Sequence, residues 1–503
     1  MSEFRTKKEV HNRAQKAVGK PMSELFGGQQ LNGKSGPGDA FEHWFGKKKD
    51  SASEPDMREA GVELKATPFK KLKKTTKSGE PMYSAKERLV LNIINYDELA
   101  AENFEHSHFL HKNSVIELGF YEYLKDVPKS QWQFKHTVLY EMEKDVNDFA
   151  VIENDWRKIQ QYVLDGKAEE LNEGMTDYLA PCTKGTNAKT MRSQPFSNVK
   201  AKQRAFSLKQ GYMTHLYRDF VDGDKKTESI FKGKFDINSG SIEEQVQARL
   251  DKWVGTSTKS LEEKLHVKST AKSVRNLLAA RMLGLSSAVK FDDDSVSVEE
   301  FEKSNIVPKT VRFDKNGKNK ESMSFPPFNF KELATETWND EDGEPSAEWH
   351  KFLIETKLLF LVFQDVDGTE KFIGAKFFRI PDKDIEGDIR EVWEDTVMKL
   401  NQGVQLIGQE APKNKRGYAI YNNFIKLTHH KICHVRPHAT FADYSIGGKY
   451  SNQLPVPARW CNQPTNHKLF ADDWMATQSF WLNNDYIKEQ VKELLRWCIP
   501  WAL

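Results

Sequence analysis

The chain has 503 residues, more than one hydrophobic core usually supports, so two or more domains are expected. Charged residues make up 29% of it and hydrophobic residues 38%, which is typical of a folded chain, and no apolar run is long enough for a membrane-spanning helix. The formal net charge is only +2, so any nucleic-acid-binding surface must be local. The cysteines form no CxxC pair, which favours free thiols in a reducing environment; they are Cys182, Cys433, Cys461 and Cys498. Together with the lack of long apolar runs, this predicts a cytoplasmic protein with no membrane partner.

Helices and strands alternate through the first part of the chain. Residues 1–31 are predicted to be helical as far as Gly19-Lys20-Pro21, and a turn rich in glycine and proline then leads into a short helix that Gly46 closes. Apolar runs predict strands after it, and the pattern around Trp156 predicts a helix that stops at Gly166. The predicted elements are a helix over 40–45, strands over 88–96, 114–123 and 134–140, and a helix over 152–164.

The stretch from Glu54 to Phe69 carries the clearest chemical pattern. In a β-strand, residues two apart share a face, so Glu63 and Lys65 point to one side while the alternating apolar residues can enter a core. A turn at Ala60-Gly61 allows Asp56 to fold back and approach Glu63. Two carboxylates beside an ammonium group are what a Mg²⁺-dependent phosphodiesterase needs, and a salt-bridged surface strand is the alternative for these residues.

Two clusters of basic residues contain no acidic residue. One directly follows the carboxylate strand, and the other lies between Asp177 and Asp219. A single run of lysines is usually a solvated face, but two such clusters, one of them adjoining the carboxylates, favour a phosphate-binding cleft. The clusters consist of Lys70, Lys71, Lys73, Lys74 and Lys77, and of Lys184, Lys189, Arg192, Lys200, Lys202, Arg204, Lys209 and Arg218.

The second half of the chain repeats the first at low similarity. Residues 243–503 carry five short patterns in the order in which residues 1–225 carry them, and the polar, turn-rich segment 226–242 is the predicted linker. One such pattern is a tryptophan followed ten residues later by a glycine, as in Trp156 with Gly166 and Trp393 with Gly403. The shared order predicts a duplication.

The second copy lacks the carboxylates of the first. Where the first copy has Glu42 and Glu63, the second has Ala280 and Val307, and only lysine equivalents such as Lys309 remain. Without these carboxylates the second copy cannot hold Mg²⁺ in the same way. The comparison predicts one active domain and one catalytically silent copy.

The sequence Pro55-Asp56 followed by Glu63-Leu64-Lys65 resembles the signature of the PD-(D/E)xK nucleases. The fuller pattern resembles the mismatch-repair nicking enzymes of the MutH family and spans most of residues 1–225. The matching positions are Lys34, Glu42, Asp56, Glu63, Lys65, Thr67-Pro68, Asp155-Trp156, Lys184 and Asn187-Ala188-Lys189. A duplicated chain of this length is similar to the GATC-cutting type II restriction endonucleases of the Sau type, which pair a MutH-like catalytic half with a degenerate MutH-like half.

This resemblance implies an α/β (α+β) fold with two MutH-like domains, each a mixed central β-sheet flanked by helices. Residues 1–225 would form the catalytic domain, and residues 243–503 a DNA-binding effector domain. The implied reaction is Mg²⁺-dependent hydrolysis of double-stranded DNA at 5′-GATC-3′ that leaves 5′-phosphate ends. The implied roles are metal ligation for Asp56 and Glu63, positioning of the attacking water for Lys65, support of the site for Glu42, and a phosphate contact or an ion pair within the site for Lys34.

The same resemblance assigns DNA reading to two segments of the first half, the turn around Lys184 and the apolar segment around Tyr212, and to matching positions of the second half. A lysine such as Lys184 can donate to guanine O6 and N7. These residues are Lys184, Asn187, Lys189, Tyr212 and Met213, and Arg436, His438 and Trp481. The chain departs from the repair enzymes in two places. Cys182-Thr183 precedes the lysine where the family has Arg-Pro, and Met213 stands where a tyrosine senses adenine methylation. The second departure predicts an enzyme that ignores adenine methylation.

Each chain has one intact centre, whereas cutting a palindrome needs two nicks, so two chains are expected to associate on DNA and to bind two copies of GATC. Two other functions stay open: a MutH-like nickase, which the long second half disfavours, and a non-catalytic DNA-binding protein. A phosphate contact for Lys184 and core packing for Trp481 are the alternatives to base reading. His106, His108 and His111 have a metal-like spacing that is more often found in solvent-exposed or core histidines.

Overall fold

The protein, described here from a computed structural model, divides into two compact units. The first comprises Met1–Lys252, Leu261–Pro308 and Glu355–Leu358, and the second comprises Trp253–Ser260, Lys309–Ile354 and Leu359–Leu503. The structure describes residues 4–31, 33, 35–47, 53–75, 79–185, 190–222, 227–268, 274–286, 289, 291, 297–319, 321–341, 343–414 and 416–495. Lys34, Asn187 and Lys189, which the sequence singles out, lie outside the described residues.

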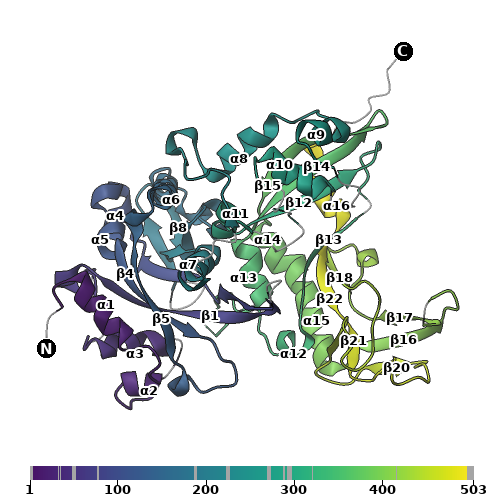
Figure 1. The fold of residues 1–503 in the computed structure, drawn as a ribbon, viewed down its shortest axis with the longest axis horizontal. Helices are drawn as coiled ribbons and strands as arrows, with labels where there is room; N and C mark the ends of the chain where they lie inside the picture. Colours follow the sequence, from purple (N-terminus) through teal and green to yellow (C-terminus); the bar gives the residue numbers. More distant parts are fainter. Residues whose placement is uncertain are drawn as a thin grey trace. The chain divides into compact units, whose positions relative to one another are not determined.

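A mixed four-stranded sheet organises the first unit (Figure 1). In spatial order its strands are β2 (Pro81–Ala85), β1 (Glu63–Thr75), β4 (Val115–Glu122) and β5 (Phe134–Glu141). β1 runs parallel to β4, whereas β2 pairs antiparallel with β1, and β5 with β4. The helices α1 (Lys7–Gln15) and α3 (Gly36–Trp44) pack against β5 and β1, and the helix α7 (Gln210–Asp222) packs against β2.

The apolar side chains of this sheet and of its N-terminal helices form a continuous core. Val62 and Leu64 are 0% and 3% exposed, so the apolar alternation of the β1 region enters the core as predicted. The ring of Phe41 of α3 packs at a tilt against that of Phe134 of β5, with ring centroids 4.8 Å apart. A side chain at Gly119 of β4 would collide with these two rings. The core therefore fixes α3 over the start of β1.

A second, three-stranded sheet follows in the first unit. In spatial order its strands are β3 (Leu89–Ile93), β9 (Arg204–Leu208) and β6 (Leu179–Thr183), and β9 is antiparallel to both neighbours. β7 (Met191–Gln194) and β8 (Ser197–Lys202) form a separate antiparallel hairpin. The other elements are α2 (Met22–Leu25), α4 (Tyr96–Ala101), α5 (His108–Asn113), α6 (Val146–Leu164), β10 (Thr227–Glu228), α8 (Ile242–Asp251), α10 (Val274–Met282), β11 (Ser297–Val298) and α11 (Glu299–Lys303).

Most predicted elements of the first unit form close to their predicted bounds, and α6 is the clearest difference. It begins at Val146, six residues before the predicted start, because the side chain of Asp145 caps it and accepts hydrogen bonds from the backbone N–H groups of Asn147 and Asp148. It ends at Leu164, shortly before Gly166, whose φ of 69° is left-handed. The predicted stop at this glycine is therefore confirmed.

Part of the strand order of the first unit, β1-β4-β5 and β3-β9-β6, recurs among the strands of the second. One sheet has the order β12-β14-β15, and another has the order β13-β22-β18, in which the middle strand is antiparallel to both neighbours. A long helix, α15 (Arg390–Gln402), follows β15 as α6 follows β5, and α16 (Asn484–Val491) follows β22 as α7 follows β9. The strands are β12 (Ile306–Phe313), β13 (Met323–Pro327), β14 (Lys357–Val366), β15 (Thr369–Phe378), β18 (Cys433–Pro437) and β22 (Gln478–Leu482).

This part of the chain has further helices and strands. They are α9 (Thr258–Lys264), α12 (Phe330–Leu333), α13 (Glu348–Glu355), α14 (Asp382–Asp384), β16 (Gln405–Glu410), β17 (Tyr418–Asn422), β19 (Ser451–Gln453), β20 (Arg459–Cys461) and β21 (Trp474–Ala476). The predicted fold class, mixed sheets flanked by helices in each half, is confirmed. No helix of the described chain is long and apolar enough to cross a membrane.

The boundaries of the two units differ from the predicted domain boundaries. Residues 226–242, the predicted linker, lie inside the first unit, and so do residues 261–308. The strands β12 and β14 each begin in the first unit and continue in the second. The shared strand order is what a duplication would produce, and the duplication itself stays a proposal.

Candidate active site

The start of β1 brings Asp56 to Glu63. Met57 and Val62 form an antiparallel bridge around a tight turn, which Gly61 closes with a left-handed φ of 64°. The backbone N–H of Asp56 donates to Glu63 Oε2 at 3.2 Å, and the backbone N–H of Leu64 donates to Asp56 Oδ2 at 3.0 Å. The side chains of Asp56 and Glu63 are 9% and 3% exposed. The fold-back predicted from the turn therefore joins two carboxylates in a nearly buried site.

Lysine ammonium groups surround these carboxylates. Lys65 Nζ donates to Glu63 Oε1 at 2.7 Å, so the two residues share a face of β1 as predicted. Lys47, just after α3, forms an ion pair with Asp56, and Lys112 of α5 lies 3.9 Å from Glu63 Oε1. The sequence offered no pattern for Lys112, while Lys47 follows the glycine that closes the Glu42 helix and could have been considered with it.

Glu42 of α3 belongs to the same cluster. Burial raises the pKa of Glu42, and the negative charge of Asp56 raises it further, while the charges of Lys47 and Lys65 oppose the rise. A carboxyl group that responds to all three must lie near them. The structure therefore brings together four of the five residues predicted for this site, and Lys34 lies outside the described residues.

The donor set suits a small divalent cation. In the described ranges, no three or more His, Cys, Asp or Glu side chains gather as a complete metal cage. Mg²⁺ does not require one, because it commonly takes one or two carboxylates and completes its shell with waters and substrate phosphate oxygens. Asp56 and Glu63 can supply that pair of hard oxygen ligands.

In the proposed second copy, the positions that match Glu42 and Glu63 do not supply carboxylate ligands. β12 carries Val307, Pro308 and Lys309 where β1 carries the carboxylate and the lysine, and α10 carries Ala280. Lys309 Nζ donates to the backbone oxygen of Ser324 at 3.4 Å, and burial lowers the pKa of Lys309. No acidic side chain occupies the equivalent positions, so this part of the chain lacks the ligands that the first copy has.

The basic residues that the sequence singles out around Lys184 differ in their exposure to solvent. Lys184 is exposed directly after β6, and its backbone N–H donates to Gln203 O at 3.0 Å. Arg192, Lys200 and Lys202 of the neighbouring hairpin are also exposed. Arg204, by contrast, is buried and donates to Pro181 O at 2.6 Å. The exposed basic surface thus comprises Lys184, Arg192, Lys200 and Lys202, without Arg204.

Tyr212 and Met213 are not available to DNA in this structure. Met213 is fully buried, and Tyr212 is 3% exposed. The Tyr212 hydroxyl donates to Asp148 Oδ2 at 3.0 Å, and Lys303 Nζ donates to the same carboxylate. The side chains of α7 that were predicted to touch bases instead pack inward, so the structure argues against that contact for both residues.

A buried ion pair lies behind the Lys184 turn and was not predicted. Arg88, directly before β3, pairs with Glu173, whose Oε1 accepts the backbone N–H of Thr183 at 3.4 Å. Arg88 also lies 3.5 Å from Glu355, and the side chains of Arg88 and Glu173 are 16% and 6% exposed. The pair therefore anchors the chain immediately before Lys184. Nothing in the local sequence marks these residues as partners, because they are 85 positions apart.

In the second unit, the three residues predicted to contact DNA gather on one face of β18 and β22. Trp481 Nε1 donates to Arg436 O at 3.2 Å, and the Arg436 guanidinium lies 5.0 Å from the Trp481 ring centre. The His438 ring lies 5.7 Å from that of Trp481, and His438 Nδ1 is 2.7 Å from Ser479 Oγ. Arg436 and His438 are exposed and Trp481 is partly so, which leaves a cationic and aromatic surface.

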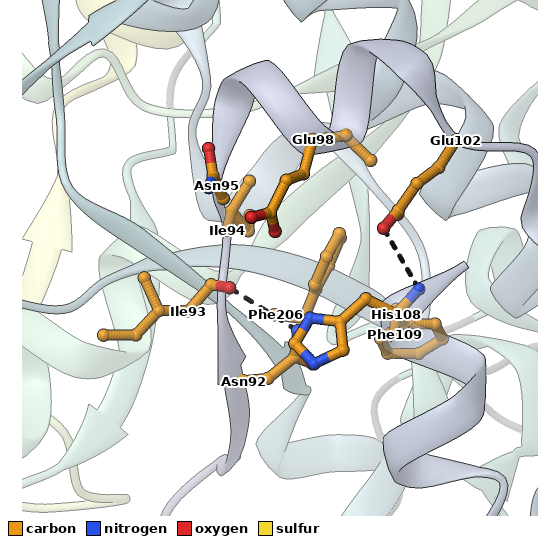
Figure 2. A pocket seen from close by; sticks show the side chains of 10 residues that line it. Asn92, Ile93, Ile94, Asn95, Glu98, Glu102, His108, Phe109 and Phe206 are labelled. Carbon is orange, nitrogen blue, oxygen red and sulfur yellow. Dashed lines mark hydrogen bonds between the residues drawn. The ribbon is translucent and has the colours of Figure 1, made fainter. Parts of the chain in front are cut away.

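The histidines with metal-like spacing have other partners. Figure 2 shows His108 in a small pocket beside β3 and α4, where its backbone N–H donates to Glu102 at 3.2 Å. Its Nε2 lies 2.9 Å from Ser53 O, and His111 pairs with Glu54 at 2.7 Å. These contacts of His108 and His111 hold the segment that leads to Asp56, which supports a structural role for both residues.

Some known proteins are similar to nearly the whole of this chain, and others to only a part of it. The family described as DNA mismatch repair enzyme MutH matches residues 45–155. The Type II restriction enzyme Sau3AI of Staphylococcus aureus is 52% identical over 497 residues, which cover 98% of this chain and 100% of that enzyme. The DNA mismatch repair protein MutH of Pasteurella multocida (strain Pm70) is 23% identical over 193 residues, 37% of this chain and 82% of that protein. The restriction enzyme thus matches both halves, and the repair protein only a part.

Proposed function

Because this chain belongs to the MutH-like type II restriction endonucleases, we propose that it hydrolyses double-stranded DNA at 5′-GATC-3′ in a Mg²⁺-dependent reaction that leaves 5′-phosphate ends. The observation that carries the proposal is the fold-back that joins Asp56 to Glu63, with Lys65 on the same face. Its position inside the segment matched by the MutH family supports the assignment.

In this proposal Asp56 and Glu63 would hold the Mg²⁺ ion, which would supply Lewis-acid chemistry to the phosphoryl group and to a bound water. Lys65 orients the attacking water, since its ammonium group is fixed by Glu63. Glu42 supports the site as a nearby carboxyl group that takes up a proton more readily than usual. Lys34 contacts the scissile phosphate or pairs within the site, as the family resemblance implies.

Base reading is assigned to Lys184, which is exposed, and, by the family resemblance, to Asn187 and Lys189, which lie outside the described residues. A lysine ammonium can donate to guanine O6 and N7, and its exposure directly after β6 supports this role. Adenine methylation is expected not to protect the site, on the sequence resemblance alone: Met213, which is buried in this structure, stands where the repair enzymes sense methylation with a tyrosine. Cleavage of fully adenine-methylated and unmethylated GATC plasmid at equal rates is the expected result, and protection by methylation contradicts it.

The second half is assigned to binding a second GATC copy as an effector, through Arg436, His438 and Trp481. An arginine stacked on an indole with a neighbouring histidine offers both a cation and a flat apolar surface to DNA. Since each chain has one intact centre, two chains are expected to associate on DNA. A two-site plasmid should then be cut faster than a one-site plasmid, and equal rates and extents would remove the effector role.

The experiment that tests the proposal is to map the ends produced from plasmid DNA in the presence of Mg²⁺ and, separately, Ca²⁺. Double-strand cuts at GATC with 5′-phosphate ends are expected in the reaction with Mg²⁺ and not in the reaction with Ca²⁺. The second candidate, a nickase of the MutH type, predicts open-circular plasmid as the final product. The likeness to MutH proteins favours it, but the identity to a restriction enzyme over both halves favours double-strand cleavage.

A further inference from the structure

Lys47 has a fixed backbone directly beside the candidate cation site. Gly46, with a φ of 74°, donates its backbone N–H to His43 O at 2.8 Å, and the Lys47 N–H donates to Glu42 O at 3.0 Å. These two bonds form the Schellman arrangement that ends a helix, so the backbone of Lys47 is set by the end of α3. From there its side chain reaches Asp56, and only 11% of it is exposed.

The helix end is itself held in place. Arg13 of α1 donates to Trp44 O at 2.7 Å through its NH2 group, and its guanidinium lies 3.6 Å from the Trp44 ring centre. Trp44 Nε1 donates in return to Arg13 O at 3.0 Å. The packing of α1 on α3 therefore fixes the position of Lys47, which is not a freely moving surface residue.

Every carboxylate oxygen of the two candidate ligands has a described partner. Asp56 Oδ1 pairs with Lys47, and Oδ2 accepts the Leu64 N–H. Glu63 Oε1 accepts from Lys65, and Oε2 accepts the Asp56 N–H. A divalent cation that binds Asp56 through Oδ1 therefore shares or takes that oxygen from a nearly buried ammonium group.

We propose that Lys47 is a functional residue of the cation site, whose ammonium group competes with the divalent metal for Asp56 and so sets the metal affinity of the free enzyme. The inference rests on the proposed function, because it takes Asp56 and Glu63 as the metal ligands. Two cations that compete for one carboxylate weaken each other's binding, and this coupling is reciprocal. Lys47 thereby limits metal loading and keeps the carboxylate charge neutralised.

The test is direct titration of the full chain with Mn²⁺ in the absence of DNA, followed by the electron paramagnetic resonance signal of the free ion. Lys47→Met removes the charge but keeps the length of the side chain, and it should bind Mn²⁺ about ten-fold more tightly, within the usual range for coupled binding. Lys47→Arg keeps the charge and should stay near the wild-type affinity. Lys135→Met, at an exposed lysine of β5, should leave the affinity unchanged.

Equal or weaker Mn²⁺ binding by Lys47→Met overturns the role of Lys47. Lys47→Gln, which keeps a hydrogen-bond donor near Asp56, gives the same comparison if Lys47→Met does not fold. A second readout is thermal unfolding with and without Mn²⁺, in which Lys47→Gln should gain more from the metal than the wild type does. Asp56→Asn separates the two proposals. If this variant binds Mn²⁺ like the wild type, the proposed metal site is wrong. If it abolishes Mn²⁺ binding while Lys47→Met and Lys47→Gln leave the affinity unchanged, only the role of Lys47 is wrong.

Discussion

The backbone N–H of Asp56 donates to the carboxylate of Glu63 at 3.2 Å, which ties the residue before the turn to the first residue of β1. This bond fixes the separation of the two candidate metal ligands. Because it uses the backbone of Asp56, substitution of its side chain removes a ligand without removing the bond. The two carboxylates can therefore be tested one at a time.

Glu63→Gln and Asp56→Asn should each lower the rate of DNA cleavage by about a thousand-fold or more, since a lost metal interaction is worth several kcal/mol in the transition state. Binding of a GATC duplex in Ca²⁺ should be retained. The measurement is single-turnover cleavage alongside a gel-shift titration. Wild-type cleavage by either variant would remove the assigned ligand.

Lys184→Ala should reduce discrimination between GATC and sites with one altered base, by about 1–3 kcal/mol at the guanine. Lys200→Ala, on the neighbouring exposed hairpin, is the matched control and should weaken binding to all sequences alike. Cleavage of a panel of single-substitution duplexes distinguishes the two. A uniform loss in Lys184→Ala would make this residue a phosphate contact.

Breaking the Arg88–Glu173 pair should destabilise the first unit and loosen the Lys184 turn. Arg88→Met leaves a nearly buried carboxylate without this partner, which costs about 3 kcal/mol in the free energy of unfolding. Arg157→Met removes an exposed pair with Glu105 and should cost less than about 1 kcal/mol. Urea unfolding gives both values. Equal costs would show that the buried pair has no special role.

The stability of the first unit should fall as pH rises from about 4.5 to about 7. Burial raises the pKa of Glu117 to about 7 despite the nearby His11, so the folded protein binds a proton that the unfolded chain releases. Because the folded state binds more protons in this window, its stability decreases with rising pH, by up to about 3 kcal/mol. Glu117→Gln should lack this component in thermal unfolding at pH 4.5 and pH 7.5. A matching pH dependence in this variant would exclude Glu117 as the source.

The part of the site that the sequence could predict is local. Strand alternation places Glu63 and Lys65 on one face, and Gly61 permits the tight turn that returns Asp56 to them. Both features depend on residues within ten positions of one another. The helix stop at Gly166 was predictable for the same reason, because a left-handed glycine acts on its own neighbours.

The remainder depends on contacts between distant segments. Lys112 and the Arg88–Glu173 pair reach their partners only after α5, β3 and β6 are assembled. The burial of Tyr212 was not predictable, because the sequence of an amphipathic helix does not show which of its faces a sheet will cover. The Tyr212 hydroxyl donates to Asp148, which lies in a helix 64 positions earlier. The two compact units do not divide at the predicted linker, 226–242, because later segments return to the first unit.

The most direct single measurement is the end-mapping of plasmid cleavage by the wild type and by Glu63→Gln with Mg²⁺. The predicted result is complete double-strand cleavage at GATC with 5′-phosphate ends in the wild type and intact plasmid in the variant. Cleavage at another sequence would contradict the proposed specificity. Undiminished cleavage by Glu63→Gln would contradict the placement of the metal site at the start of β1.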